Sequence, residues 1–568
     1  MTAPVEHYGA IVVGSGFGGS VTACRLAQAG MEVCLLERGR RYPPGSFARS
    51  PRDMRDNFWD PVAGRFGLFE VLSFGKVDAV VSAGLGGGSL IYANVLLRKE
   101  EDAFVRRRPD GSFEEWPIRR SDLERHYDHV EAVLTPQPYP LDHAPYDATP
   151  KTLAMRKAAA DAGVEWFLPP LAVTFANDGG PPVPGEPVRD AGGRTDDNLH
   201  RRSRTTCRLC GECDIGCNYG SKNTLDFTYL TLADKAGAVL RDGCEVTRIA
   251  PRPGGGYLVD YVVHAPDGGA RPAGRGGPPP VTASADRLVL AAGTLGTTAL
   301  LLRNRANFPG LSRRLGHFFS GNGDFLGFVH GARESVGGVE GTRVLSPSRG
   351  PVITSSVRVP RDGTGGGFYV QEGGYPVLVD WLVEASNGLG VLGRTARAAG
   401  ERVEARLEGR RDPELDPQIV EVLGDAHRSS SILPLLGMGL DTPDGVLSID
   451  DRSGALRLHW SARRSSAYFS EVESTMEEIA AALGARFQVD PLWYLRHKVV
   501  TVHPVGGCAM GRSPEDGVVD GDGEVFGYPG LVVADGAVMP GPVGPNPSLT
   551  IAALADRFAE HQIDAPRR

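Results

Sequence analysis

The feature that most constrains this fold is a glycine-rich turn joining a short apolar strand to a helix near the start of the chain. Residues 9–13 predict a buried strand, residues 20–29 a helix ended by Gly30, and residues 31–36 a second strand. The turn after the first strand reads G-x-G-x-x-G, with its glycines at Gly14, Gly16 and Gly19. Strand, glycine turn, helix and strand in this order predict a nucleotide-binding βαβ unit.

Each part of this pattern has a physical role. Gly14 permits the tight turn, Gly16 lets backbone N–H groups approach a pyrophosphate, and Gly19 lets helix and strand pack closely. The positive end of the helix dipole stabilises the phosphate charge. Glu37 lies 18 residues beyond Gly19, where a carboxylate can accept hydrogen bonds from a ribose hydroxyl. The motif predicts a dinucleotide but does not distinguish NAD from FAD.

Length and charge narrow the remaining possibilities. A chain of 568 residues is expected to form two domains or one large composite. Its hydrophobic and charged fractions, 41% and 23%, are typical of globular proteins. The net charge is −8, and the densest basic run, residues 200–204, is short, so a nucleic-acid partner is not expected. We interpret this basic run as a solvated loop.

The sequence also bears on location. No apolar stretch approaches the roughly 20 residues that a transmembrane helix needs, so no transmembrane segment is expected. The first strand begins at once and leaves no room for a secretory signal, which favours a cytoplasmic location. Structural disulfides are therefore not expected among the eight cysteines.

The last seventy residues carry three candidate site features. His503 follows a short apolar run and precedes a glycine turn, and Asp535 ends the apolar strand 531–533. Asn546 and Pro547 precede a helix, where asparagine suits the N-cap and proline the first helical position. The helix dipole then places positive potential at Asn546. Its side chain either caps the helix or contacts a substrate, and both interpretations stay open.

These features, taken together, resemble the glucose–methanol–choline (GMC) oxidoreductases, and most of all their bacterial cholesterol oxidase-like branch. The matching segments occur in the family's order from residue 9 to residue 558. They are the glycine turn with Glu37, Gly84-Leu85-Gly86-Gly87-Gly88-Ser89-Leu90-Ile91-Tyr92-Ala93-Asn94, Trp116-Pro117, Leu290-Ala291-Ala292-Gly293-Thr294, His503-Pro504-Val505-Gly506-Gly507, Asp535-Gly536 and Asn546-Pro547.

This resemblance implies FAD as the cofactor and an α/β fold, more exactly an α+β composite. A Rossmann-like FAD-binding domain would carry an inserted substrate-binding domain built on a mostly antiparallel sheet. The FAD-binding pieces would be 1–48, 78–98, 220–310 and 497–568. The substrate-binding pieces would be 49–77, 99–219 and 311–496. The sequence does not specify an oligomeric state.

The resemblance also assigns cofactor contacts. The loop around Gly87 would lie against the flavin, backbone of Val246 would meet the adenine, and Asp535 would touch the pyrophosphate or ribityl region. The expected FAD-binding residues are Gly14, Gly16, Phe17, Gly18, Gly19, Glu37, Gly87, Gly88, Ser89, Asn94, Val246, Gly293, Asp535, Gly536, Asn546 and Pro547.

The expected reaction is oxidation of an alcohol to a ketone or aldehyde, with hydride transfer to flavin N5. His503 is the expected proton acceptor, because imidazole ordinarily titrates near pH 6.5, and Asn546 would hold the substrate oxygen or the flavin edge. The His/Asn pair is the form seen in cholesterol oxidases. The expected substrate is a sterol or another bulky apolar alcohol, with dioxygen as acceptor. A flavoenzyme using this site for other chemistry and a non-catalytic flavin-binding protein are the alternatives.

Two further features are open to a functional or a structural interpretation. Glu372 is either a carboxylate that shifts a sterol double bond or a surface or turn residue. The aromatic-rich segment 50–74 is either a lid over an apolar substrate or ordinary packing.

Four cysteines form a separate motif with ferredoxin-like C-x-x-C-x-x-C-x-x-x-C spacing, with Asn218 in place of the usual proline. They are Cys207, Cys210, Cys213 and Cys217. Four clustered thiolates suit an iron–sulfur cluster or a tetrahedral zinc, and the alternative without a metal is free thiols or local disulfides. With an iron–sulfur cluster, a dehydrogenase that feeds a protein or quinone acceptor becomes an alternative to the oxidase.

Overall fold

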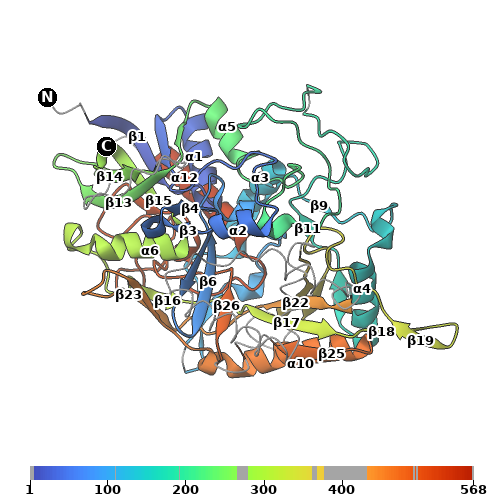
Figure 1. Cartoon of the computed structure of the whole chain (residues 1–568). Helices are drawn as coiled ribbons and strands as arrows, with labels where there is room; N and C mark the ends of the chain where they lie inside the picture. The colour runs from blue at the N-terminus through green and yellow to red at the C-terminus, as the bar shows by residue number, and fades with distance from the viewer. Residues whose placement is uncertain are drawn as a thin grey trace, which may run out of the picture.

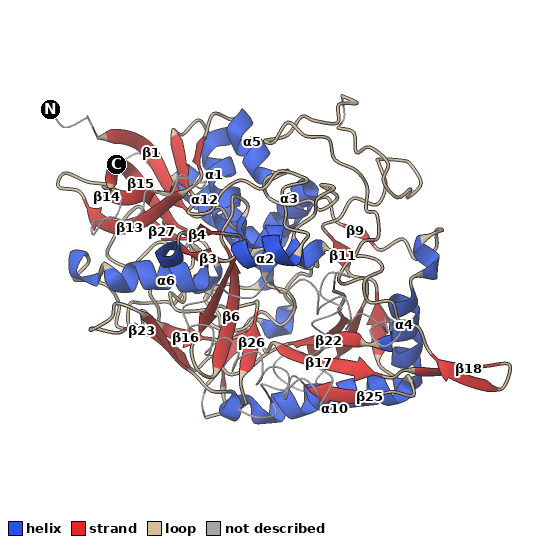
Figure 2. Cartoon of the chain, viewed as in Figure 1, coloured by secondary structure: helices blue, strands red, loops and turns tan. Residues whose placement is uncertain are grey.

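The fold is taken from a computed structural model, which describes residues 5–108, 110–190, 192–264, 279–360, 367–375, 431–489, 493 and 497–565. Two large sheets lie at opposite ends of the molecule, and helices cover their faces (Figures 1 and 2). Each sheet has its own cluster of buried apolar side chains.

The first sheet has seven strands and contains the glycine turn. Its order is β12 (Val239–Arg241), β2 (Val33–Leu36), β1 (Glu6–Val13), β15 (Val281–Leu290), β14 (Tyr257–Val263) and β13 (Cys244–Pro251), with β27 (Leu531–Val533) also on β15. Strands β12, β2, β1, β15 and β27 pair in parallel, and β14 and β13 are antiparallel. Because residues 10–13 of β1 and all of β2 are buried, these segments read as continuous apolar runs rather than alternating ones.

Helices cover this sheet and place the two ends of the chain together. They are α1 (Phe17–Gln28), α5 (Tyr229–Lys235), α12 (Ser548–Asp564), α3 (Glu124–Leu134) and α6 (Gly293–Arg303). Helix α1 packs against both α5 and α12, and α3 packs on α12. The described chain ends, blue and red in Figure 1, accordingly lie close together.

The second sheet has six strands and is antiparallel throughout. Its order is β10 (Glu165–Phe167), β20 (Ser356–Val359), β21 (Phe368–Glu372), β22 (Leu433–Met438), β17 (Phe325–His330) and β25 (Arg486–Val489). Helices α10 (Ser466–Ala482) and α4 (Pro150–Ala162) pack on it and on each other.

A three-stranded sheet, β5 (Phe69–Ser73), β6 (Val77–Ser82) and β26 (Val499–Thr501), lies between the two large ones (Figure 1). Besides short 3-10 turns, the other described α-helix and strands are α2 (Pro51–Asp56), β3 (Trp59–Asp60), β4 (Arg65–Phe66), β7 (Val105–Arg107), β8 (Phe113–Glu115), β9 (Gln137–Pro138), β11 (Pro170–Leu171), β16 (His317–Phe319), β18 (Arg333–Val336), β19 (Val339–Thr342), β23 (Gly445–Ile449) and β24 (Leu456–His459).

This architecture confirms the expected fold class, a Rossmann-like unit combined with a mostly antiparallel sheet. The predicted strands 9–13 and 31–36 correspond to β1 and β2, and Gly30 takes a positive φ just after α1. All eight cysteines are free thiols. In the described part of the chain, no helix combines the length and hydrophobicity needed to cross a bilayer.

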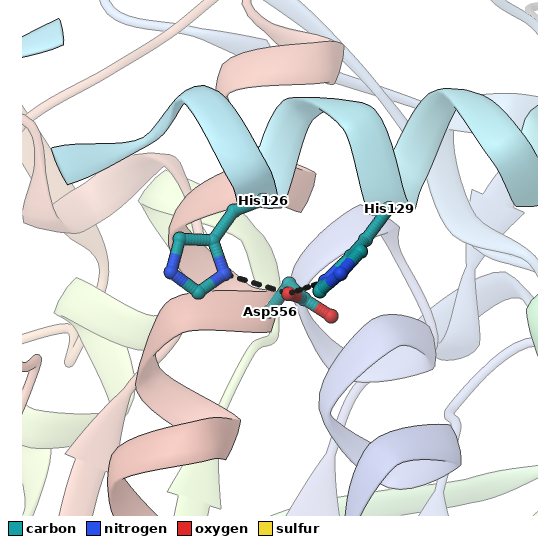
Figure 3. Close-up of side chains that lie close together, drawn as sticks. All are labelled: His126, His129 and Asp556. Atoms are coloured by element: carbon teal, nitrogen blue, oxygen red, sulfur yellow. Dashed lines mark hydrogen bonds and ion pairs between the residues drawn. The ribbon is translucent and has the colours of Figure 1, made fainter. Parts of the chain in front are cut away.

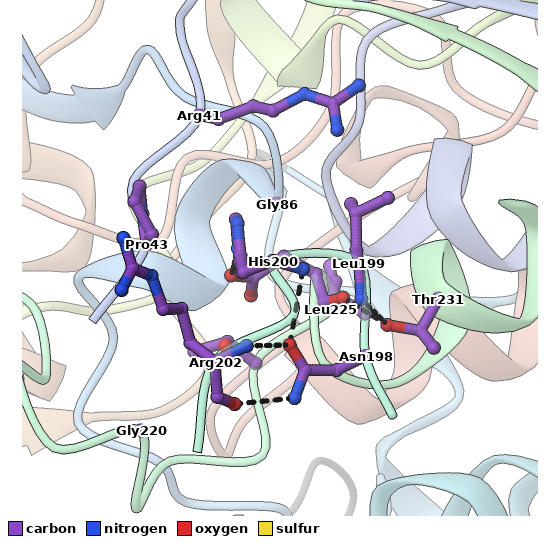
Figure 4. A network of polar contacts seen from close by, with 12 residues as sticks. Arg41, Pro43, Gly86, Asn198, Leu199, His200, Arg202, Gly220, Leu225 and Thr231 are labelled. Atoms are coloured by element: carbon purple, nitrogen blue, oxygen red, sulfur yellow. Dashed lines mark hydrogen bonds and ion pairs between the residues drawn. The ribbon is translucent and has the colours of Figure 1, made fainter. Parts of the chain in front are cut away.

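The basic run 200–204 is a loop whose residues 201–203 are exposed, as expected, but both of its ends are anchored. His200 is buried, and its Nε2 lies 2.6 Å from a carboxylate oxygen of Asp226. The Arg204 guanidinium donates to the carbonyl of Gly220 and the side chain of Asn223. Asn198 holds the turn by accepting from the backbone of residues 200 and 202 and donating to the carbonyl of residue 202 (Figure 4). The side chains at the two ends of the run, His200 and Arg204, therefore have structural partners.

Candidate active site

The glycine turn lies where the parallel strands of the first sheet end, the edge at which α/β folds bind nucleotides. A Cβ on Gly14, whose φ is +96°, would lie 2.2 Å from the Ala291 carbonyl oxygen. A Cβ on Gly18 would lie 1.4 Å from the Ala534 carbonyl oxygen, and one on Gly19 2.0 Å from that of Gly14. The loops after β1, β15 and β27 thus meet without room for side chains.

A second glycine loop closes over the first. A Cβ on Gly87 would lie 2.5 Å from the Gly16 Cα, and the Gly86 N–H donates to the Ser15 hydroxyl at 2.9 Å. Glu37 fixes this arrangement, since its buried carboxylate accepts from the Ser15 N–H and Oγ and from the Gly39 N–H. Burial raises the pKa of Glu37. The carboxylate expected at a ribose therefore also holds the turn in shape.

The surroundings of these loops fit FAD. A Cβ on Gly16 or Gly88 would meet no atom within 4 Å, so both glycines expose backbone toward open space. Asn94 is fully buried with φ +72°, and its side-chain oxygen has no hydrogen-bond partner among the described residues. Asp535 is buried at the end of β27, and burial raises its pKa to about 6. Open backbone amides and buried polar groups of this kind match a phosphate-bearing cofactor.

Four further predicted cofactor residues lie in the first sheet or in the segments that adjoin it. Val246 is in β13, at a bulge in its pairing with β14. Gly293 starts α6 with φ +79°, directly after β15. Phe17 begins α1 and packs edge-to-face on Tyr92, which follows the second glycine loop. Ser89 is buried in that loop and donates to the Gly86 carbonyl.

His503 is held by a carboxylate that the sequence did not reveal. Its Nδ1 lies 2.7 Å from Oδ1 of Asp324, while Oδ2 accepts from the Thr501 hydroxyl and the Val502 N–H. The His503 side chain is 17% exposed and that of Asp324 is 9% exposed. Because the carboxylate occupies Nδ1, the proton belongs there and Nε2 is left with a lone pair. The ring is thus oriented as a base.

The side chain of Asn546 does not cap the helix, which settles one of the open alternatives. Helix α12 begins at Ser548, so Pro547 is the N-cap and no side chain makes a capping hydrogen bond. Asn546 Oδ1 instead accepts a hydrogen bond at 2.9 Å from Nε2 of Gln371, which is a residue of β21. With its oxygen occupied, the Asn546 amide is oriented to donate through Nδ2. Gln371 was missed, because nothing in its sequence context distinguishes it from a core strand residue.

One segment, residues 320–324, links the two ends of this site. Asn322 accepts from the Val543 N–H and donates to the Pro545 carbonyl, so it holds the loop that leads to Asn546. Asp324, two residues on, holds His503. The same loop is held from the other side by Lys99, fully buried, which donates to the carbonyls of residues 542 and 543. Asn and Asp in a glycine-rich turn before an apolar strand were the signal that could have pointed to this segment.

Glu372 is not the surface or turn residue that the sequence allowed, and its role in shifting a double bond stays a prediction. It is completely buried, which excludes a surface residue, and it neighbours Gln371 on β21, so the two side chains point to opposite faces of the sheet. Its carboxylate accepts from the hydroxyls of Thr354 and Ser355 and lies 3.6 Å from Lys151 Nζ. Gln371 faces Asn546, and Glu372 therefore faces away from it.

The four cysteines line one small cavity together with Lys222. Cys207, Cys210 and Cys213 each meet a backbone N–H, and the Cys217 sulfur accepts from the Ser221 N–H at 3.3 Å. No three of the sulfurs come within 4.8 Å of one another. The Lys222 ammonium donates to the carbonyls of Leu90, Tyr92 and Cys213, which joins this cavity to the second glycine loop.

The aromatic segment mostly packs on itself and on the first sheet. Trp59 is buried and meets Phe66 edge-to-face, and both rings contact His264 at the end of β14. Phe58 is 40% exposed and packs on Phe69. These contacts favour the packing interpretation.

Comparisons with known proteins agree with this geometry. A family model for GMC oxidoreductases matches residues 459–555, and one for NAD(P)-binding Rossmann-like domains matches residues 12–61. A cholesterol oxidase of Mycobacterium tuberculosis is 32% identical over 97% of this chain and 90% of its own, and one of Acinetobacter baumannii is 27% identical over 98% and 94%.

A solved structure, that of pyridoxine 4-oxidase from Mesorbium loti, shares the fold, with a TM-score of 0.52 and 16% identity over 97% of this chain and 98% of its own. Sequence identity above 30% along nearly the whole length of both chains, with the matching C-terminal family model, places this oxidoreductase in the GMC family.

Proposed function

We propose that this protein is an FAD-dependent enzyme that oxidises an alcohol carbon to a ketone or aldehyde. The observation that carries the proposal is the pair of oriented polar groups, His503 fixed through Nδ1 and Asn546 fixed through Oδ1. Relatives named cholesterol oxidase, and a long-chain-alcohol oxidase of Arabidopsis thaliana that is 22% identical, support an alcohol as the substrate class.

The chemistry divides between cofactor and chain. When bound, FAD supplies the acceptor for the hydride that leaves the alcohol carbon. His503 accepts the hydroxyl proton at Nε2, and Asp324 stabilises the resulting imidazolium. Asn546 donates from Nδ2 to the alcohol oxygen or to the flavin edge. The cofactor-binding residues and the domain boundaries predicted from the sequence belong to this proposal, and the cytoplasmic location stays a prediction.

For the substrate we propose a sterol or another bulky apolar alcohol, and for the electron acceptor dioxygen, which would yield hydrogen peroxide. The test is a panel of sterols, long-chain alcohols and small polar alcohols added anaerobically to the purified enzyme. Bleaching of the flavin absorbance identifies substrates, and peroxide release in air identifies dioxygen as acceptor. A protein that binds no FAD, or that no alcohol reduces, would refute the proposal.

The cysteine cavity favours a second candidate, a dehydrogenase in which an iron–sulfur cluster at Cys207, Cys210, Cys213 and Cys217 passes electrons to a protein or quinone. All four cysteines line one cavity, and the Cys217 sulfur accepts from the Ser221 N–H. Burial raises the pKa of the Cys207, Cys210 and Cys213 thiols, so a bound metal would have to stabilise their thiolates. Iron analysis of anaerobically purified protein decides this, with iron expected in the wild type and lost in Cys213→Ser.

A further inference from the structure

A cluster of potential metal ligands lies outside the candidate active site, where α3 crosses α12. His126 and His129 project from one face of α3 toward Asp556 of α12 (Figure 3). Their Nδ1 atoms lie 2.7 and 3.2 Å from the same carboxylate oxygen, Oδ2. This is the one group of three such ligand atoms within 4.8 Å of one another among the described residues.

Hydrogen bonding alone leaves this cluster unsatisfied. The His126 side chain is 1% exposed, and in the described structure its Nε2 has no hydrogen-bond partner. The nearest carboxylate oxygen, from Glu560, lies 3.8 Å from that nitrogen. If Nδ1 donates to Asp556, Nε2 carries a lone pair that faces a carboxylate in a buried site, which is unfavourable.

Coordination of a metal reverses this arrangement. A histidine that binds a metal through Nδ1 carries its proton on Nε2, and the N–H then faces the Glu560 carboxylate. A carboxylate behind a metal-bound histidine is the usual second contact in protein metal sites. Arg25 does not compete, since its Nε lies 3.1 Å from Oδ1 of Asp556 and leaves Oδ2 to the ion.

We propose that His126, His129 and Asp556 bind a divalent transition-metal ion of the zinc class. Two imidazoles and one carboxylate suit zinc, nickel or copper rather than magnesium or calcium, which prefer oxygen ligands. The His129 side chain is 49% exposed, so an ion can enter from solvent and keep water as its fourth ligand. The ion joins α3 to α12, the helix that starts just after Asn546, and its role is structural.

The experiment uses the purified FAD-bound enzyme, stripped with a chelator and then titrated with ZnCl2. Zinc content and the thermal unfolding temperature are measured for wild type, His129→Ala and His143→Ala. His143 is a matched control, because it is also exposed and beside an aspartate, but lies outside this cluster. We expect the wild type and His143→Ala each to bind one more zinc ion per chain than His129→Ala does. Zinc should raise the thermal unfolding temperature of the wild type and His143→Ala, but not that of His129→Ala.

Any zinc bound by the cysteines is present equally in the wild type and in His129→Ala, because this variant keeps all the cysteines. The difference in zinc content between the two proteins therefore reports the proposed site alone. A second variant, Glu560→Gln, keeps all three ligands and should weaken zinc binding roughly 10-fold. Equal zinc content and equal zinc-dependent stabilisation in wild type and His129→Ala would overturn the proposal. So would a cluster that only titrates with pH, seen as a pH-dependent unfolding temperature that zinc does not alter. Alcohol oxidation can fail or succeed independently of either result.

Discussion

Asp324 Oδ1 lies 2.7 Å from His503 Nδ1, and this contact decides which nitrogen of the ring can act as a base. The carboxylate is fixed in turn by the Thr501 hydroxyl and by the backbone N–H groups of Val502 and His503, which directly follow β26. The histidine therefore cannot rotate without losing a buried hydrogen bond. A base with one defined tautomer and one defined direction is what proton abstraction from a bound alcohol requires.

Replacing Asp324 by Asn keeps the size of the side chain but removes its charge. An amide no longer stabilises the imidazolium, and it allows the ring to take the wrong tautomer. We expect the rate of anaerobic flavin reduction by substrate to fall roughly 100-fold or more, with FAD content unchanged. Stopped-flow absorbance at the flavin band measures this. A variant whose reduction rate and pH profile match the wild type would show that Asp324 has no part in positioning the base.

Gln371→Met tests the orientation of Asn546. Methionine fills a similar volume but cannot donate, so the Asn546 amide loses the partner that fixes its oxygen. We expect roughly 5-fold slower flavin reduction and little change in FAD affinity, since one buried hydrogen bond contributes about 1 kcal/mol. Asn546→Ala is the reference, because it removes the amide entirely. Adding Gln371→Met to Asn546→Ala should cost nothing further if the two residues act together.

Substitutions at Gly18 and Gly16 test two different roles of the glycine turn, chain folding and cofactor binding. Gly18→Ala would force a methyl group against the Ala534 carbonyl and should prevent folding of the first sheet. Gly16→Ala meets no protein atom within 4 Å, so the chain should fold with wild-type secondary structure. It should nevertheless lose FAD affinity, because the methyl group occupies the face open to the pyrophosphate. Circular dichroism and FAD titration distinguish these outcomes, and full FAD binding by Gly16→Ala would argue against this placement.

How much of the fold and of the site could be predicted from the sequence depends on how far apart the interacting residues lie along the chain. The glycine turn, β1, β2 and Glu37 were predictable because strand, turn and helix are local, and backbone proximity demands glycine. His503 and Asn546 were recognisable by their motifs. Asp324 and Gln371 were not, because each meets its partner from more than 170 positions away, and a hydrogen bond at that separation leaves no local pattern. Glu372 was not recognised as a buried residue, because the burial of β21 depends on how distant parts of the chain pack against its two faces.

The stability of the enzyme should depend on pH through Asp441. Burial raises the pKa of this carboxyl from 3.8 to about 7, even though it accepts hydrogen bonds from Ser320 and Gly321. The folded state therefore favours the protonated form, and this contribution to stability is present below about pH 4 and lost as pH rises through 7.

Asp441→Asn cannot titrate, so relative to wild type it should be more stable at pH 8 than at pH 5, by a difference on the order of 3 kcal/mol. Urea unfolding at both pH values measures the effect. Asp450→Asn is the control: hydrogen bonds from Ser453 lower the pKa of the Asp450 carboxyl, so it is ionised at both pH values and its loss should leave the difference between pH 5 and pH 8 unaltered. An Asp441→Asn variant that tracks the wild type across this range would mean that the carboxyl is ionised throughout.

Glu372→Gln distinguishes a structural carboxylate from a catalytic one. Glu372 and Lys151 are both completely buried, and the lysine's other hydrogen bond goes to the Val352 carbonyl. A neutral glutamine leaves the ammonium without its counter-charge, which should destabilise the fold by roughly 3 kcal/mol. Adding Lys151→Met removes the uncompensated charge and should restore most of that loss. Because Glu372 faces away from Asn546, the ketone formed by Glu372→Gln should have its double bond at the same position as the wild-type product. A product whose double bond lies at a different position from that of the wild type would show that Glu372 takes part in the reaction.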